Sequence, residues 1–228
     1  MLLRIVSLAI AAAITHLFAH LRLPRSDDPQ AHRWMGTVLQ EHSSTVGGYK
    51  QQITDAFTVK SHWQEASTLD PNDATCHHLL GRWCFTVTDM PWYQRKVASA
   101  LFATPPSSTY EEALTHFQAA EHISPGFWKA NQYYIALCYQ RLNQPDEATT
   151  WARSAALLPV QTEEDKTTHD KTMALLKKLS PNDAKEVEVA LAARHAVADR
   201  LQSIEDEAEA ELQAAAMAAV KGSSSLRE

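Results

Sequence analysis

Glycine is scarce in this sequence, with six in 228 residues, and long alternations of valine, isoleucine or threonine with polar residues are absent. Alternation of that kind is typical of half-buried strands, so its absence excludes a fold built mainly on sheets. Residues that favour helices, such as alanine, leucine, glutamate and lysine, are abundant instead. With a hydrophobic content of 45%, which is normal for a packed core, the sequence predicts an all-α protein.

Motifs that bind phosphates or build hydrolytic centres are also missing. No glycine-rich phosphate loop, Gly-x-Ser-x-Gly turn or His-Glu-x-x-His pair occurs anywhere in the chain. The eleven histidines are scattered over helical segments and form no recognisable nucleophile–base set. We therefore expect a protein that is not an enzyme, needs no cofactor and functions by binding.

The three cysteines, Cys76, Cys84 and Cys138, each fall in an apolar helical pattern, and no Asn-x-Ser/Thr glycosylation site is present. An odd number of such thiols is typical of a reducing, intracellular compartment. Cys76, His77, His78 and Cys84 resemble a set of metal ligands. Because adjacent side chains on a helix diverge by about 100°, these four cannot converge on one ion, and no metal site is predicted.

Basic residues are fewer than acidic ones, and the net charge is −6. Most of this negative charge lies from Asn182 onward, while the preceding part of the chain is nearly neutral. Proteins that bind nucleic acid carry clusters of lysine and arginine on one face. The charge pattern therefore excludes nucleic acid as the main partner.

Three segments end their helices alike, with a small, a large and a second small residue before a proline, although in the third the middle residue is alanine. The sets are Val59, Trp63 and Ala66 before Pro71; Ala113, Phe117 and Ala120 before Pro125; and Ala148, Ala152 and Ala155 before Pro159. Small residues allow close helix contacts, large ones fill the space between repeats, and proline ends the helix. With partner helices between them, the segments predict a tetratricopeptide-like α–α superhelix whose unit is about 34 residues.

The middle repeat is longer than the others. About 20 residues are added between Gly81 and Ala113, relative to a standard unit. We predict a turn at Pro91, a short helix from Trp92 to Phe102, and a stiff linker at Pro105 and Pro106. Repeat proteins often carry insertions on the face where function is added, so this insert is the first place to look for a binding site.

Cationic and aromatic residues gather at this insert, and we take them as the candidate partner or ligand face: Arg82, Trp83, Trp92, Tyr93, Arg95 and Lys96. This mixture fits an acidic peptide tail or a phosphate head group. In the alternative interpretation, the aromatic side chains form the packed core of the insert and the cationic groups extend into solvent. An enclosed apolar cavity here would favour lipid, whereas a filled core with an open groove would favour a peptide.

The N-terminal segment, residues 1–26, differs from the repeat domain that we place at residues 27–180. It contains no acidic residue and three arginines. Three interpretations are open: a mitochondrial presequence, a membrane anchor over the apolar run from Ile5 to Leu21, or the last helix of a truncated repeat.

A long acidic helix is predicted for residues 181–220, followed by a flexible tail at 221–228. Apolar residues recur every three or four positions from Val197 to Ala219, with acidic residues between them. Such a narrow stripe fits either a helix that caps the end of the solenoid or a site for a coiled-coil partner.

The segment from His77 to Glu121, with its inserted helix and double proline, resembles the signature region of the regulator of microtubule dynamics family. The AHRWMG, LDPND and PGFWKAN motifs are similar to that family in order and spacing, so the resemblance covers roughly residues 29–158. It implies a helical-repeat fold, no enzymatic activity, a protein partner such as tubulin, and a cytoplasmic location on microtubules and spindle poles. It also implies an alternative, in which the chain binds anionic phospholipid as a tether at mitochondria.

Overall fold

The computed structural model describes residues 27–45, 49–102 and 105–224, and within these ranges every regular element is a helix. The helices are α2 (Pro29–Thr45), α3 (Tyr49–Leu69), α4 (Ala74–Thr88), α5 (Trp92–Leu101), α6 (Tyr110–Ile123), α7 (Lys129–Arg141), α8 (Pro145–Leu157), α9 (Glu163–Leu179) and α10 (Pro181–Ser224). The predicted all-α fold is confirmed.

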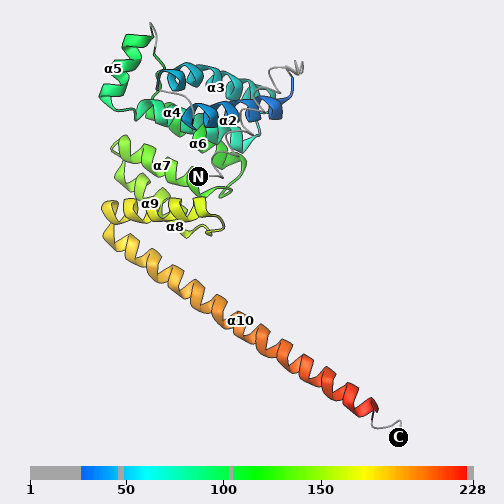
Figure 1. Cartoon of the computed structure of the whole chain (residues 1–228). Helices are drawn as coiled ribbons and strands as arrows, with labels where there is room; N and C mark the ends of the chain where they lie inside the picture. The colour runs from blue at the N-terminus through cyan, green and yellow to red at the C-terminus, as the bar shows by residue number, and fades with distance from the viewer. Residues whose placement is uncertain (1–26, 46–48, 103–104, 225–228) are drawn as a thin grey trace.

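Successive helices pack as pairs, and the pairs stack into an array. Helix α2 contacts α3, α4 contacts α6, and α7 contacts α8, while α9 closes the far end against α8. Figure 1 shows this stack, with α5 at its outer edge and α10 leaving the opposite end as a long rod. The inserted helix therefore interrupts the α4–α6 pair in sequence without separating its two helices in space. The predicted α–α superhelix with an insertion is confirmed.

The large residues of the repeat pattern pack against glycine on the partner helix. Trp63 is 3% exposed and Phe117 is fully buried, as the pattern predicts. A Cβ atom added to Gly36 would lie 2.4 Å from Nε1 of Trp63, and one added to Gly81 would lie 2.8 Å from the ring of Phe117. The absence of a side chain at these two glycines thus lets each aromatic ring contact the facing helix backbone directly.

Polar side chains define where several helices begin. Asp73 caps α4 by accepting a hydrogen bond from the backbone amide of Cys76, and it also accepts one from Arg33 of α2 at 2.8 Å. Thr109 caps α6 in the same way, through the amide of Glu112. Each cap satisfies an otherwise unpaired backbone group, so the start of each helix is set locally.

Only the beginning of α10 belongs to the packed array. Ala184 and Val187 are each 1% exposed and pack against α8 and α9, so this part caps the solenoid. Farther along, Val197, Leu201 and Ile204 are 61%, 57% and 51% exposed. The helix continues to Ser224 and does not end at residue 220 as expected. A coiled-coil partner for its exposed stripe stays a prediction.

The three interpretations of residues 1–26 concern a segment that lies outside the described residues. Within the part of the chain that the structure describes, no helix combines the length and apolar character needed to cross a bilayer.

Candidate functional site

Helix α5 presents aromatic side chains to solvent. Trp92, Tyr93 and Val97 are 70%, 54% and 44% exposed. The two aromatic rings lie edge to face, with their centroids 6.1 Å apart. Among the described side chains of this helix, Ala98 alone is buried, and the helix packs against α3. The packed-core interpretation is therefore wrong for Trp92 and Tyr93.

The cations of α5, Arg95 and Lys96, follow Trp92 and Tyr93 by three residues on the same helix. Arg95 and Lys96 are both exposed, and neither takes part in an ion pair among the described residues. The helix itself contains no acidic residue. Because Trp92, Tyr93, Arg95, Lys96 and Val97 share one short exposed helix, we call these five residues the α5 surface.

The other two residues of the candidate face point elsewhere. Trp83 is 6% exposed, its Nε1 donates a hydrogen bond to the carbonyl of Ala56 at 2.9 Å, and Lys60 lies 4.3 Å from its ring centroid. Arg82 instead lies 5.4 Å from the ring centroid of Tyr134 on α7. Trp83 thus belongs to the core contact with α3 and Arg82 to the contact with α7. The structure does not bring them together with the α5 surface.

A buried polar cluster joins α4, α6 and α7. His78 is fully buried, its Nδ1 donates to Oδ1 of Asn131 at 2.9 Å, and its ring centroid lies 4.2 Å from that of Trp128. Asn131 in turn donates to the carbonyl of Phe117 at 3.0 Å. Burial lowers the pKa of His78 to about 3, so the imidazole is neutral at pH 7. Asn131 therefore satisfies Nδ1 of His78, whereas Nε2 of the same ring is buried without a hydrogen-bond partner among the described residues.

Between α2 and α3 the structure contains a pocket of about 60 Å³, lined by Ser43, Asp55 and neighbouring residues. Ligand sites for small molecules have volumes of about 300 Å³ or more. This pocket is too small for a lipid chain, and α5 does not contribute to it.

The cysteine–histidine cluster considered as a metal site diverges, as expected. The Sγ atom of Cys76 donates to the carbonyl of Trp63, and Nε2 of His77 lies 3.0 Å from the carbonyl of Pro71. His78 is bound to Asn131, as described above. Each of the three side chains therefore has a different neighbour.

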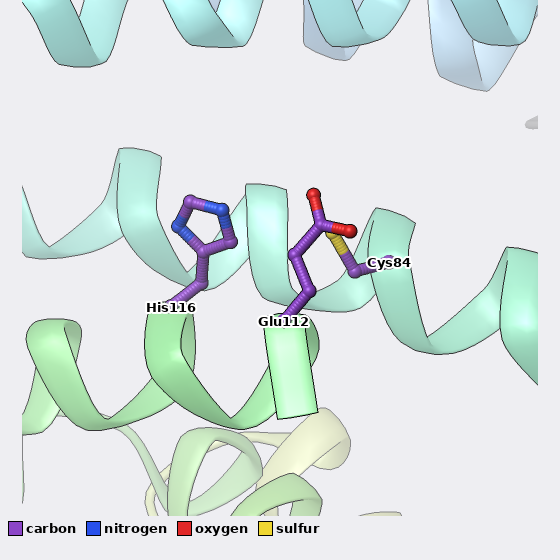
Figure 2. A group of neighbouring side chains, drawn as sticks. All are labelled: Cys84, Glu112 and His116. Carbon is purple, nitrogen blue, oxygen red and sulfur yellow. The ribbon is translucent and has the colours of Figure 1, made fainter. Parts of the chain in front are cut away.

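Cys84 meets two potential metal ligands that come from another helix. Figure 2 shows its thiol on α4 facing the side chains of Glu112 and His116 on α6. One ligand atom from each residue lies within 4.8 Å of the other two. This group was not predicted from the sequence. The four-residue spacing of Glu112 and His116 was a signal that they share a helix face, but it did not indicate that this face meets Cys84.

Comparison with known proteins gives one consistent family. A profile described as "Regulator of microtubule dynamics protein 1-3" matches residues 11–180. The chain is 43% identical over 149 residues to regulator of microtubule dynamics protein 1 of Rattus norvegicus, covering 64% of this chain and 47% of that protein. It is 40% identical over 152 residues to regulator of microtubule dynamics protein 3 of Xenopus laevis, covering 65% and 32%. The chain thus spans about half the length of the first relative and about a third of the second.

Two solved structures were also matched. PcrH of Pseudomonas aeruginosa is 16% identical with a TM-score of 0.45, and the match covers 67% of this chain and 91% of that one. A thermophilic TPR protein of Thermus thermophilus is 16% identical with a TM-score of 0.44, covering 84% and 93%.

Proposed function

Because the chain belongs to the regulator of microtubule dynamics family, we propose that it is a non-enzymatic, microtubule-associated adaptor whose α5 surface binds an acidic partner. The partner chemistry that fits best is a glutamate-rich peptide such as a tubulin tail. The observation that carries this proposal is the pairing of exposed aromatic rings with unneutralised cations on the inserted helix.

The aromatic residues support a binding role for α5. Trp92 at 70% exposure and Tyr93 at 54% stay in water although both are large enough to bury substantial apolar area. Aromatic and arginine side chains are enriched where proteins bind partners, and exposed apolar patches mark such sites. The two rings lie edge to face with centroids 6.1 Å apart, so they offer a partner one continuous aromatic patch.

The cations support an acidic partner. Arg95 and Lys96 are free of ion pairs within the described residues, so neither must give up a protein contact to bind a carboxylate. Arginine can form two parallel hydrogen bonds to a carboxylate. An open helix surface suits an extended peptide, whereas the small pocket between α2 and α3 offers no room for an acyl chain.

The test is co-sedimentation of the full chain with microtubules, comparing the parent with an Arg95→Glu/Lys96→Glu variant. At low salt, reversal of two exposed charges should weaken binding about tenfold, and the difference should shrink as salt rises. Lys166→Glu/Lys171→Glu on α9 is the matched control, because it makes the same charge change at exposed lysines of another helix. The control should bind like the parent.

A second arm uses microtubules from which the acidic tails have been removed by proteolysis. The parent should bind these about as weakly as the double variant binds intact microtubules. Equal binding of parent and α5 variant to intact microtubules would refute the role of α5. Binding of the parent to anionic vesicles in place of microtubules would refute the tubulin assignment.

A further inference from the structure

The contact between α4 and α6 holds three side chains of different metal-binding chemistry. Cys84 supplies a thiol, Glu112 a carboxylate and His116 an imidazole (Figure 2). This set suits a cation of borderline softness such as Zn²⁺, since Ca²⁺ and Mg²⁺ prefer all-oxygen sites. We propose that Cys84, Glu112 and His116 form a zinc site that joins α4 to α6.

The distances allow such a site with a small adjustment of side chains. Zinc lies about 2.0–2.3 Å from its nitrogen, oxygen and sulfur ligands, which places tetrahedral ligand atoms about 3.5 Å apart. The three atoms now lie within 4.8 Å of one another. Cys84 is fixed in the core, but Glu112 has a side chain that is 41% exposed and several rotatable bonds. The ion therefore enters from the side of Glu112, and the carboxylate closes onto it.

Two of the three ligands need not lose a proton when zinc binds at neutral pH. The pKa of His116 is lowered, mainly by burial and also by His77 and Lys60, although Glu112 acts in the opposite direction. The ring of His116 is therefore neutral at pH 7. Burial acts to raise the pKa of Glu112, but hydrogen bonds from Ser108 and Lys60 leave it lowered. Only the Cys84 thiol, whose pKa burial raises to about 11, must release its proton to the solvent as the ion binds.

Lys60 is the main competitor for the site, because its Nζ lies 3.3 Å from Oε1 of Glu112. The same Nζ lies 4.3 Å from the ring centroid of Trp83. When Glu112 turns towards the ion, Lys60 keeps this cation–π contact and does not lose every partner. The hydroxyl of Ser108 donates to Oε2 of Glu112 at 2.6 Å. With three protein ligands, the fourth tetrahedral position of the ion would be left for water.

Cobalt titration of the full chain, purified in the presence of a chelator, tests the site. Co²⁺ should produce the near-ultraviolet charge-transfer band of a cobalt–thiolate bond, and one equivalent of Zn²⁺ should remove it. Zinc should also raise the melting temperature, because it binds the folded state. Cys84→Ser should abolish the band, and Glu112→Gln and His116→Gln should each weaken cobalt binding more than about tenfold.

Cys76→Ser is the matched control, because Cys76 is an equally buried thiol on the same helix but lies outside the group. It should retain the band and the zinc-dependent rise in melting temperature. If Cys84→Ser does not fold, the two partly exposed positions, Glu112 and His116, decide the question. The proposal is wrong if the parent shows no cobalt–thiolate band, or if Glu112→Gln and His116→Gln bind cobalt as tightly as the parent.

Discussion

Acidification should destabilise this fold through His78. Burial lowers the pKa of this side chain to about 3, against an opposing hydrogen bond to Asn131 and with a smaller contribution from the charge of Arg82. In the unfolded chain the same group titrates near pH 6.5. Below pH 6.5 the unfolded state therefore binds a proton that the folded state does not. Stability decreases as the pH is lowered from 6.5 to about 3.

The magnitude follows from the size of this window. Each pH unit well inside this window costs about 1.4 kcal/mol, and the slope is half of that at pH 6.5. The free energy of unfolding should therefore fall by roughly 2 kcal/mol between pH 6.5 and pH 4.5 through this group alone. A contribution of that size is a large fraction of the stability of a typical domain. His62, His116 and His169 also have a lowered pKa and act in the same direction.

Urea unfolding at a series of pH values measures this effect. His78→Gln keeps an N–H group that can donate to Asn131 but does not titrate, so it isolates His78 from the other histidines. The variant should be less stable than the parent at pH 7. As pH drops from 6.5 towards 3, its stability should fall less steeply, because unfolding of the variant takes up about one proton fewer than unfolding of the parent. His122→Gln, at an exposed histidine, is the control and should keep the slope of the parent. Equal slopes for parent and His78→Gln would refute the reasoning.

Three further substitutions test the packing. Gly81→Ala places a Cβ 2.8 Å from the ring of Phe117 and should reduce stability to urea by about 1–3 kcal/mol, whereas an unchanged midpoint would contradict the close contact. Lys129→Met removes a buried ammonium that donates to two carbonyls at the end of α8 at 2.7 Å each, and should lower the free energy of unfolding by about 1–3 kcal/mol. An unchanged urea midpoint would contradict this role of Lys129. Arg153→Ala removes ion pairs to Asp183, which is half-buried, and to Glu186, which is exposed, and should leave the melting temperature nearly unchanged. A drop comparable to that of Lys129→Met would contradict this.

Much of the fold could be predicted from the sequence because it rests on local patterns. The spacing of Trp63 and Phe117 before their prolines identified both as residues buried between helices, and the structure confirms this. The inserted helix was predicted from Trp92 to Phe102 and is observed from Trp92 to Leu101. Helix periodicity and proline positions involve residues within a few turns of each other, so a short stretch of sequence is enough to predict them.

The candidate sites were predicted less well. Trp83 and Trp92 both looked like members of one aromatic face, yet the first is 6% exposed and the second 70%. Which side of a helix is buried depends on where that helix packs. Helix α5 packs against α3, and Ala98 is its one buried residue among the described side chains. The sequence around the insert therefore showed that aromatic and cationic side chains are present, but not which of these side chains face solvent.

By itself, the sequence determined that this chain is helical, that it repeats, where it is interrupted, and which family it resembles. These features depend on the order of residues within single helices and turns. Only the tertiary structure decided that Cys84 meets Glu112 and His116, that Arg82 turns towards α7, and that α10 leaves the array after its first turns. Each of these depends on the register and rotation of one helix against another, which arise from packing across the whole array.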